Sequence, residues 1–198
     1  MSDPLPNPAF RRAVCWAGTL NLAYFGVEFA MALAIGSVSL FADSIDFLED
    51  ASVNLLIMLA LGWSLRQRAR LGMALAGILL LPGLATLWMA WHKFLHPVPP
   101  APALLSITAA GAMLVNAGCA ILLARHRAHG GSLAKAVYLS ARNDVLANIA
   151  IILAGAVTAY LWASAWPDLL VGLGIAAMNA DAAREVWTAA REEHSAAA

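Results

Sequence analysis

The sequence predicts an all-α, polytopic membrane protein with six transmembrane helices, and three observations lead to this fold class. Of its 198 residues, 62% are hydrophobic and only 12% are charged, with a mean hydropathy of +0.74. A soluble domain carries about twice that share of charged residues. The formal net charge is zero and no strongly basic stretch is present, which disfavours a nucleic-acid partner. The apolar residues also gather into long runs, each matching the roughly 20 residues that a membrane-spanning helix needs.

Six spans are expected, separated by helix breakers and charged residues. They cover residues 12–36, 39–64, 70–94, 102–124, 134–160 and 167–190. The breaks are Gly36-Ser37, the run from Arg66 to Arg70, the run from His96 to Pro102, the stretch from His126 to Gly131, and Ala165 to Pro167. Strands are not expected, because a barrel strand needs only about ten alternating residues.

The distribution of Lys and Arg predicts that both termini lie in the cytoplasm. In that orientation the cytoplasmic side holds Arg11, Arg12, Arg66, Arg68, Arg70, Arg125, Arg127, Lys135, Arg184 and Arg191. The outer side holds only Lys93, and Arg142 lies inside a span, where we expect a salt bridge with Glu28, Glu49 or Asp181. The predicted layout is a polar cytoplasmic N-terminus (1–11), a six-span domain (12–190) and a short cytoplasmic tail (191–198).

Two features of the apolar runs receive a purely structural interpretation. Cys15 and Cys119 have no metal-ligand spacing, and we expect both to be buried thiols. Gly172, Ala176 and Ala180 give the last span a face of small residues, which favours close helix packing.

The second span carries acidic residues where they are costly. An acid at mid-membrane costs about 2.5–3.5 kcal/mol and is a functional candidate for that reason. Asp43, Asp46, Glu49 and Asp50 fall within eight residues, and Asn54 follows one turn later. At 100° per residue, all of these except Glu49 lie within an arc of about 80°.

The fifth span brings polar residues to the same depth. Ser140, Asp144 and Asn148 follow one another at four-residue intervals on one helix face. Asp50 lies roughly 16 Å from the outer surface and Asp144 roughly 15 Å from the inner surface, so both reach the middle of the bilayer. Asp46, Asp50 and Asp144 can therefore meet, and such a cluster is tolerable where a cation binds or protons neutralise it. Competition between the cation and protons for these carboxylates would couple metal release to proton uptake.

These residues resemble the signatures of the cation diffusion facilitator (cation efflux) family. GSVSLFADSIDFLED, from Gly36 to Asp50, is similar to GSxALLADxxHxxxD, in which Asp sometimes replaces the His. The segment from Ser140 to Asn148 resembles the HxxxD motif of the fifth span, and Trp166-Pro-Asp168 resembles the start of the sixth. The resemblance, over residues 12–190, implies a six-span exporter of divalent metals, usually zinc, that exchanges cytoplasmic metal for external protons. The implied metal ligands are Asp46, Asp50, Ser140 and Asp144.

Two departures from the family pattern bear on this expectation. Ser140 stands where the family has His or Asp, so the ligand set is all oxygen, which suits harder ions than zinc. Zinc remains the first choice through its frequency in the family, with cadmium, cobalt, manganese, iron and nickel open; no cofactor is expected. Only REEHSAAA follows the sixth span, where family members commonly continue into a dimerising cytoplasmic domain. A homodimer through the membrane spans stays open.

Further polar residues are candidates for supporting roles. Asp43, Asn54, Asn148 and Glu49 could relay ions or protons or support the ligands, although Asp43 could instead cap the second span. His126 and His129 could capture metal near the cytoplasmic entrance, or could simply be solvated. The expected location is a bacterial inner (plasma) membrane.

Two other functions are compatible with membrane carboxylates. An accessory or sensor protein would bind metal without moving it, as the Ser140 departure and the short tail would allow. An intramembrane aspartyl protease would use two aspartates as a catalytic dyad. Those enzymes carry YD and GxGD motifs, whereas Asp144 follows Arg-Asn and Asp50 follows Leu-Glu. The sequence therefore favours a transporter over an enzyme.

Overall fold

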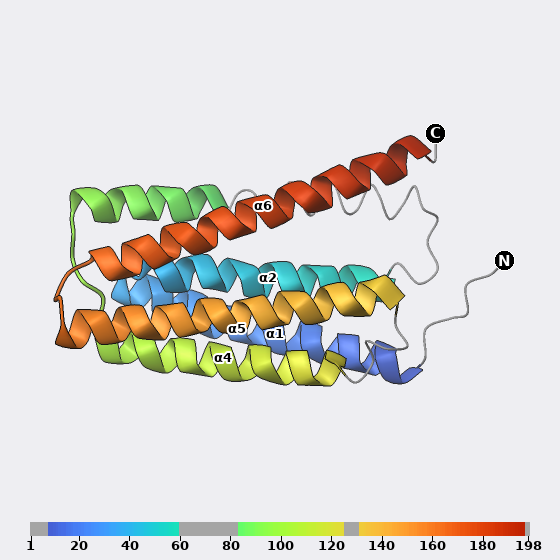
Figure 1. Cartoon of the computed structure of the whole chain (residues 1–198), viewed down its shortest axis with the longest axis horizontal. Helices are drawn as coiled ribbons and strands as arrows, with labels where there is room; N and C mark the ends of the chain where they lie inside the picture. Colours follow the sequence, from blue (N-terminus) through green and yellow to red (C-terminus); the bar gives the residue numbers. More distant parts are fainter. Residues whose placement is uncertain (1–7, 60–82, 125–130, 197–198) are drawn as a thin grey trace.

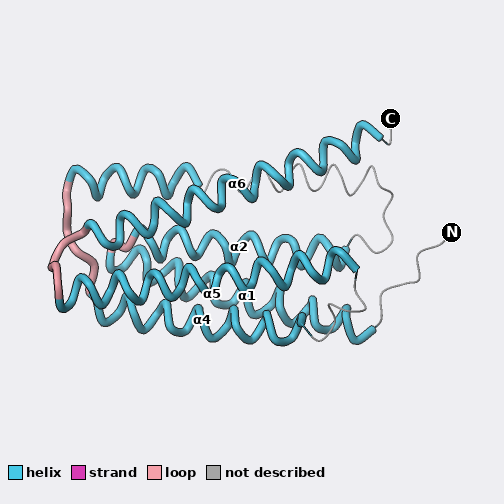
Figure 2. Tube along the Cα trace, in the orientation of Figure 1, coloured by secondary structure: helices cyan, strands magenta, loops and turns pink. Residues whose placement is uncertain are grey.

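The chain folds into a bundle of long α-helices (Figures 1 and 2). The structure is a computed structural model and describes residues 8–59, 83–124 and 131–196. The helices are α1 (Pro8–Ile35), α2 (Val38–Leu59), α4 (Pro102–Ala124), α5 (Gly131–Tyr160) and α6 (Trp166–Ala196), together with helical residues 83–95. No strand occurs within the described ranges. The predicted all-α fold is confirmed.

The helix boundaries follow the sequence prediction closely. α4 has the expected limits, α5 begins three residues before the expected start at 134, and α6 continues six residues beyond the expected end at 190. The expected spans 39–64 and 70–94 both run into residues 60–82, which lie outside the described residues. His126 and His129 also lie outside them, so the proposed metal capture in that loop stays a prediction.

A glycine turn joins α1 to α2. Gly36 has a φ of +62°, in the left-handed region that side chains rarely adopt. The Ser37 N–H donates to the Ala32 carbonyl at 2.9 Å, which closes the last turn of α1. The Ser37 hydroxyl in turn accepts from the Leu40 N–H at 3.2 Å, so this serine caps the start of α2. Two residues therefore suffice to reverse the chain.

Small residues let the helices approach one another. A Cβ added at Gly172 of α6 would lie 2.7 Å from the Val38 carbonyl carbon, so this glycine permits close contact between α6 and α2. Between α5 and α4, a Cβ at Gly155 would meet the Ser106 hydroxyl. The expected close packing is confirmed at Gly172, whereas Ala176 and Ala180 of the same small-residue face line a cavity.

The exterior of the bundle is apolar. Among the described residues, two helices are long and apolar enough to cross a membrane, over Arg11–Ile35 and Pro102–Leu123, and Asp144–Tyr160 forms a shorter apolar helix. α2 has four acids within eight residues, which lower its mean hydropathy. The start of α1 and the end of α6 lie at the same end of the bundle (Figure 1).

The two cysteines differ in environment. Cys119 is buried, as expected, but Cys15 is exposed on α1. The expectation of a buried thiol was wrong for Cys15 because the outer face of a membrane helix is as apolar as its inner face, so an apolar run does not reveal burial.

Candidate cation site

Acidic side chains of α2 point into the bundle. Asp43 is fully buried, and Asp46 and Asp50 are partly buried. Their placement follows from the helical repeat, which puts residues three and four apart on one face, and from the packing of α2 between α1, α5 and α6. The arc of polar residues expected along this helix therefore faces protein.

Asp144 of α5 lies near the α2 acids. The negative charge of Asp144 acts on Asp46, and that of Asp50 acts on Asp144. In the described part of the chain, however, no group of three or more His, Cys, Asp or Glu side chains is close enough to hold a metal ion. The side chain of Ser140 lies outside the description, although its backbone belongs to α5. The four-residue ligand set remains a prediction.

Asp50 is oriented by a side chain that the sequence did not single out. The Asn21 amide of α1 donates to Asp50 Oδ2 at 3.1 Å, and the Cys119 thiol of α4 donates to Asn21 Oδ1 at 3.5 Å. Asn21 is almost completely buried. A buried amide in the first span was the available signal, since a polar group is kept inside an apolar bundle only when it has partners.

Two asparagines occupy equivalent places behind the acids. Asn54 donates to the Asp50 carbonyl at 2.8 Å, and Asn148 donates to the Asp144 carbonyl at 2.8 Å. Both amides are buried, and the Oδ1 atom of each has no hydrogen-bond partner. Each acid is thus followed one turn later by an unpaired amide oxygen, an atom type that binds cations.

Glu28 of α1 is a further buried acid. It is fully buried beside Asp43, with which it interacts, and no close hydrogen bond reaches either carboxyl group within the described residues. The sequence had suggested Glu28 only as a partner of Arg142, whose side chain is outside the described residues. Glu28 therefore joins the site residues as an acid that sequence reasoning placed in a different role.

Glu49 faces a separate space. It lines a cavity of about 350 Å³ between α2, the helical residues 83–87 and α6, together with Thr86 and Asn179. Its charge still acts on Asp46 and Asp144. Glu49 is thus an electrostatic neighbour of the cluster that lies on another side of α2.

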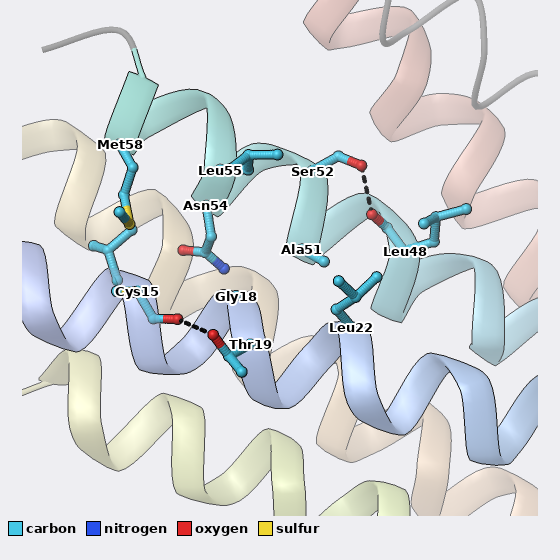
Figure 3. A pocket seen from close by; sticks show the side chains of 11 residues that line it. Cys15, Gly18, Thr19, Leu22, Leu48, Ala51, Ser52, Asn54, Leu55 and Met58 are labelled. Carbon is cyan, nitrogen blue, oxygen red and sulfur yellow. Dashed lines mark hydrogen bonds between the residues drawn. The ribbon is translucent and has the colours of Figure 1, made fainter.

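A second cavity, of about 240 Å³, lies between α1 and α2 (Figure 3). Its lining residues are Val14, Cys15, Gly18, Thr19, Leu22, Leu48, Ala51, Ser52, Asn54, Leu55 and Met58. The Thr19 and Ser52 hydroxyls donate to carbonyls of their own helices, those of Cys15 and Leu48. This groove contains no acid among its lining residues, and Asn54 reaches across it toward Gly18 (Figure 3).

A buried ion pair joins three helices at the other end of α2. The Lys93 ammonium lies 2.7 Å from Asp168 Oδ2 and also donates to the Gly36 carbonyl at 2.7 Å. Asp168 accepts from the backbone N–H groups of Val38 and Ser39, at 3.0 and 3.2 Å, and from the Ser37 and Ser39 hydroxyls at 2.6 Å. A carboxylate at a helix N-terminus is stabilised by the exposed N–H groups and the helix dipole.

We interpret this ion pair as structural, because both Lys93 and Asp168 have several hydrogen-bond partners within the protein. Lys93 was expected only as the single basic residue of the outer side, and the pair was not foreseen because its members lie 75 residues apart. The resemblance had marked Asp168 by its position alone. Its role here is to fasten α6 to the start of α2.

Comparison with protein families agrees with this architecture. The family model of the cation efflux transmembrane domain matches residues 15–192, which include every acid described above. A search of curated proteins gave no match to the chain. The chain therefore belongs to the cation efflux family of membrane proteins, which transport metal cations.

Proposed function

We propose that the protein is a proton-coupled secondary transporter that exports a divalent transition-metal cation through a site between α2 and α5. The observation that carries this proposal is the proximity of Asp46, Asp50 and Asp144, three acids inside an apolar bundle whose charges act on one another. Mutually repelling carboxylates are tolerated in such a place when a cation or protons offset their charge.

The proposed ligands are Asp46 and Asp50 from α2 and Ser140 and Asp144 from α5. Coordination of one ion by all of these ligands requires a movement of α2 or α5, because no three described acids are grouped closely enough to hold a metal ion. Zinc is the first candidate, and the all-oxygen ligand set also suits manganese. The amide oxygens of Asn54 and Asn148, each one turn from an acid, are placed to complete an ion's coordination.

Proton coupling follows from the same carboxylates. An acid that binds a metal must give up its proton, so cation binding and protonation exclude one another. In a membrane with the acidic side outside, protons that enter the site from that side would displace the metal there. The proposed setting is a bacterial inner membrane, with residues 12–190 as a six-span domain and both termini in the cytoplasm.

The proposal is tested by flux into proteoliposomes. With an imposed proton gradient, the wild type should accumulate Zn²⁺ or Mn²⁺ and move protons the other way, while Asp144→Asn should do neither. Ser52→Ala is the matched control, because its hydroxyl bonds only within α2 at the edge of the apolar groove. Metal binding by the wild type without flux would instead identify a sensor or accessory protein, and full flux in Asp144→Asn would refute the site.

A further inference from the structure

Glu28, Asp43 and Asn148 come from three different helices and meet one turn away from the proposed transport site. Glu28 lies on α1, Asp43 on α2 and Asn148 on α5, and all three are fully buried. Asp43 interacts with both Glu28 and Asn148. Along α2, Asp43 precedes Asp46 by about 4.5 Å, and along α5 Asn148 follows Asp144 by about 6 Å. Both steps lead toward the end of the bundle that holds Lys93 and Asp168.

The carboxyl groups of Glu28 and Asp43 lie side by side, and the Asn148 amide lies beside Asp43. Within the described residues, no close hydrogen bond reaches the four carboxyl oxygens or Asn148 Oδ1. Two ionised carboxylates side by side repel one another, so their burial requires either a shared proton or a cation between them. The Tyr24 hydroxyl, on which the charges of Glu28 and Asp43 act, does not serve this need, because it donates to the Thr108 carbonyl at 2.7 Å.

We propose that Glu28, Asp43 and Asn148 form a second cation site, which holds the divalent ion after it leaves the transport site. Two carboxylates balance the charge of one divalent ion, and the unpaired Asn148 oxygen adds a neutral ligand of the kind that hard cations take. The site deepens the proposed function and rests on it, since the ion is the same cargo. Its ligand set is entirely oxygen.

The number of bound ions tests the proposal. The purified full-length chain in detergent, at alkaline pH, is dialysed to equilibrium against Mn²⁺ and, in parallel, Zn²⁺. The wild type should bind two ions, Glu28→Gln one, Asp144→Asn one, and the double variant none. Glu28→Asp keeps the charge and should restore the second ion at lower affinity. Ser52→Ala, whose hydroxyl donates to the Leu48 carbonyl of its own helix, should still bind two ions.

The outcomes separate the two proposals. If the wild type binds one ion that Asp144→Asn removes and Glu28→Gln retains, the transport site stands and the second site is refuted; the carboxyl pair then holds only a proton. If Glu28→Gln loses all binding while remaining folded by circular dichroism, Glu28 belongs to a single shared site, and the second site is again refuted. If the wild type binds no ion, the proposed function fails as well.

Discussion

Asp50 accepts a hydrogen bond from a neutral side chain of another helix. The Asn21 amide donates to the Asp50 carboxylate at 3.1 Å, and the Cys119 thiol donates to the Asn21 amide oxygen. Cys119 thus helps to hold Asn21, which in turn orients Asp50. Groups that orient a ligand typically contribute 10- to 100-fold to metal affinity. Asn21 therefore belongs to the site although it is neither charged nor on α2 or α5.

Replacing Asn21 should weaken metal binding without unfolding the protein. Asn21→Ala removes the Asn21 hydrogen bond to the Asp50 carboxylate, and we expect the dissociation constant for Mn²⁺ to rise about 10-fold. Equilibrium dialysis measures this change. Thr19→Ala is the control on the same helix, because its exposed hydroxyl bonds only to the Cys15 carbonyl. Unchanged affinity in Asn21→Ala would show that Asp50 needs no support from α1.

The Lys93–Asp168 pair is the second feature at the residue scale. Removing one member of a buried ion pair leaves the other uncompensated, so Asp168→Asn should lower the free energy of unfolding by about 3–5 kcal/mol. Unfolding in detergent titrated with SDS measures it. Adding Lys93→Met to Asp168→Asn should cost less than the sum of the two single changes, because both disrupt one interaction. Simple additivity would mean that the two residues act independently.

At the scale of elements, the sequence predicts where helices lie better than which way they face. α4 has the predicted limits because Pro102 and the prolines before it set its start. α6 continues to Ala196 because alanine, arginine and glutamate favour a helix, although they fall outside an apolar run. Cys15 is exposed because a helix that is apolar on all sides gives no periodic signal of its buried face.

Substitution of Gly172 tests the close contact between α2 and α6. A methyl group there would lie 2.7 Å from the Val38 backbone, so Gly172→Ala should lower the free energy of unfolding by about 1–3 kcal/mol. Gly174→Ala is the matched control two residues away, since no atom lies within 4 Å of its added Cβ. In an SDS titration the control should be neutral or stabilising by up to about 1 kcal/mol. Equal effects of both changes would argue against close packing at Gly172.

At the scale of the whole molecule, the fold class and most site residues follow from the sequence, whereas the pairs between helices do not. The composition indicates that the exterior faces lipid. Acids within apolar runs indicate a functional site even when the packing of the helices is not known. The interactions of Asn21 with Asp50 and of Glu28 with Asp43 join residues 29 and 15 positions apart. They depend on how helices rotate against one another, which local pattern does not encode.

The predicted membrane topology can be tested by labelling. In a chain whose own cysteines are changed to serine, Ala163→Cys lies between α5 and α6 and should react with a membrane-impermeant maleimide on intact cells. Ser195→Cys, near the end of α6, should react only after the membrane is permeabilised, because six spans place it in the cytoplasm. The opposite pattern would reverse the orientation, and labelling of both sites on intact cells would exclude the six-span arrangement.

The hydrogen bonds around Asp168 also determine how α2 can swing. Donors from the start of α2 and from Lys93 all bond to the buried Asp168 carboxylate. The start of α2 therefore cannot separate from the start of α6 without leaving a buried charge unpaired. We therefore expect α2 to tilt relative to α6 about these contacts, so that the displacement of a residue increases with its distance along α2. Asp50 lies about 18 Å from Val38, so a tilt of about 10° moves it about 3 Å. Such a shift exceeds a metal–oxygen bond length, so a small tilt of α2 with the Asp168 contacts intact is enough to make or break metal coordination at Asp50.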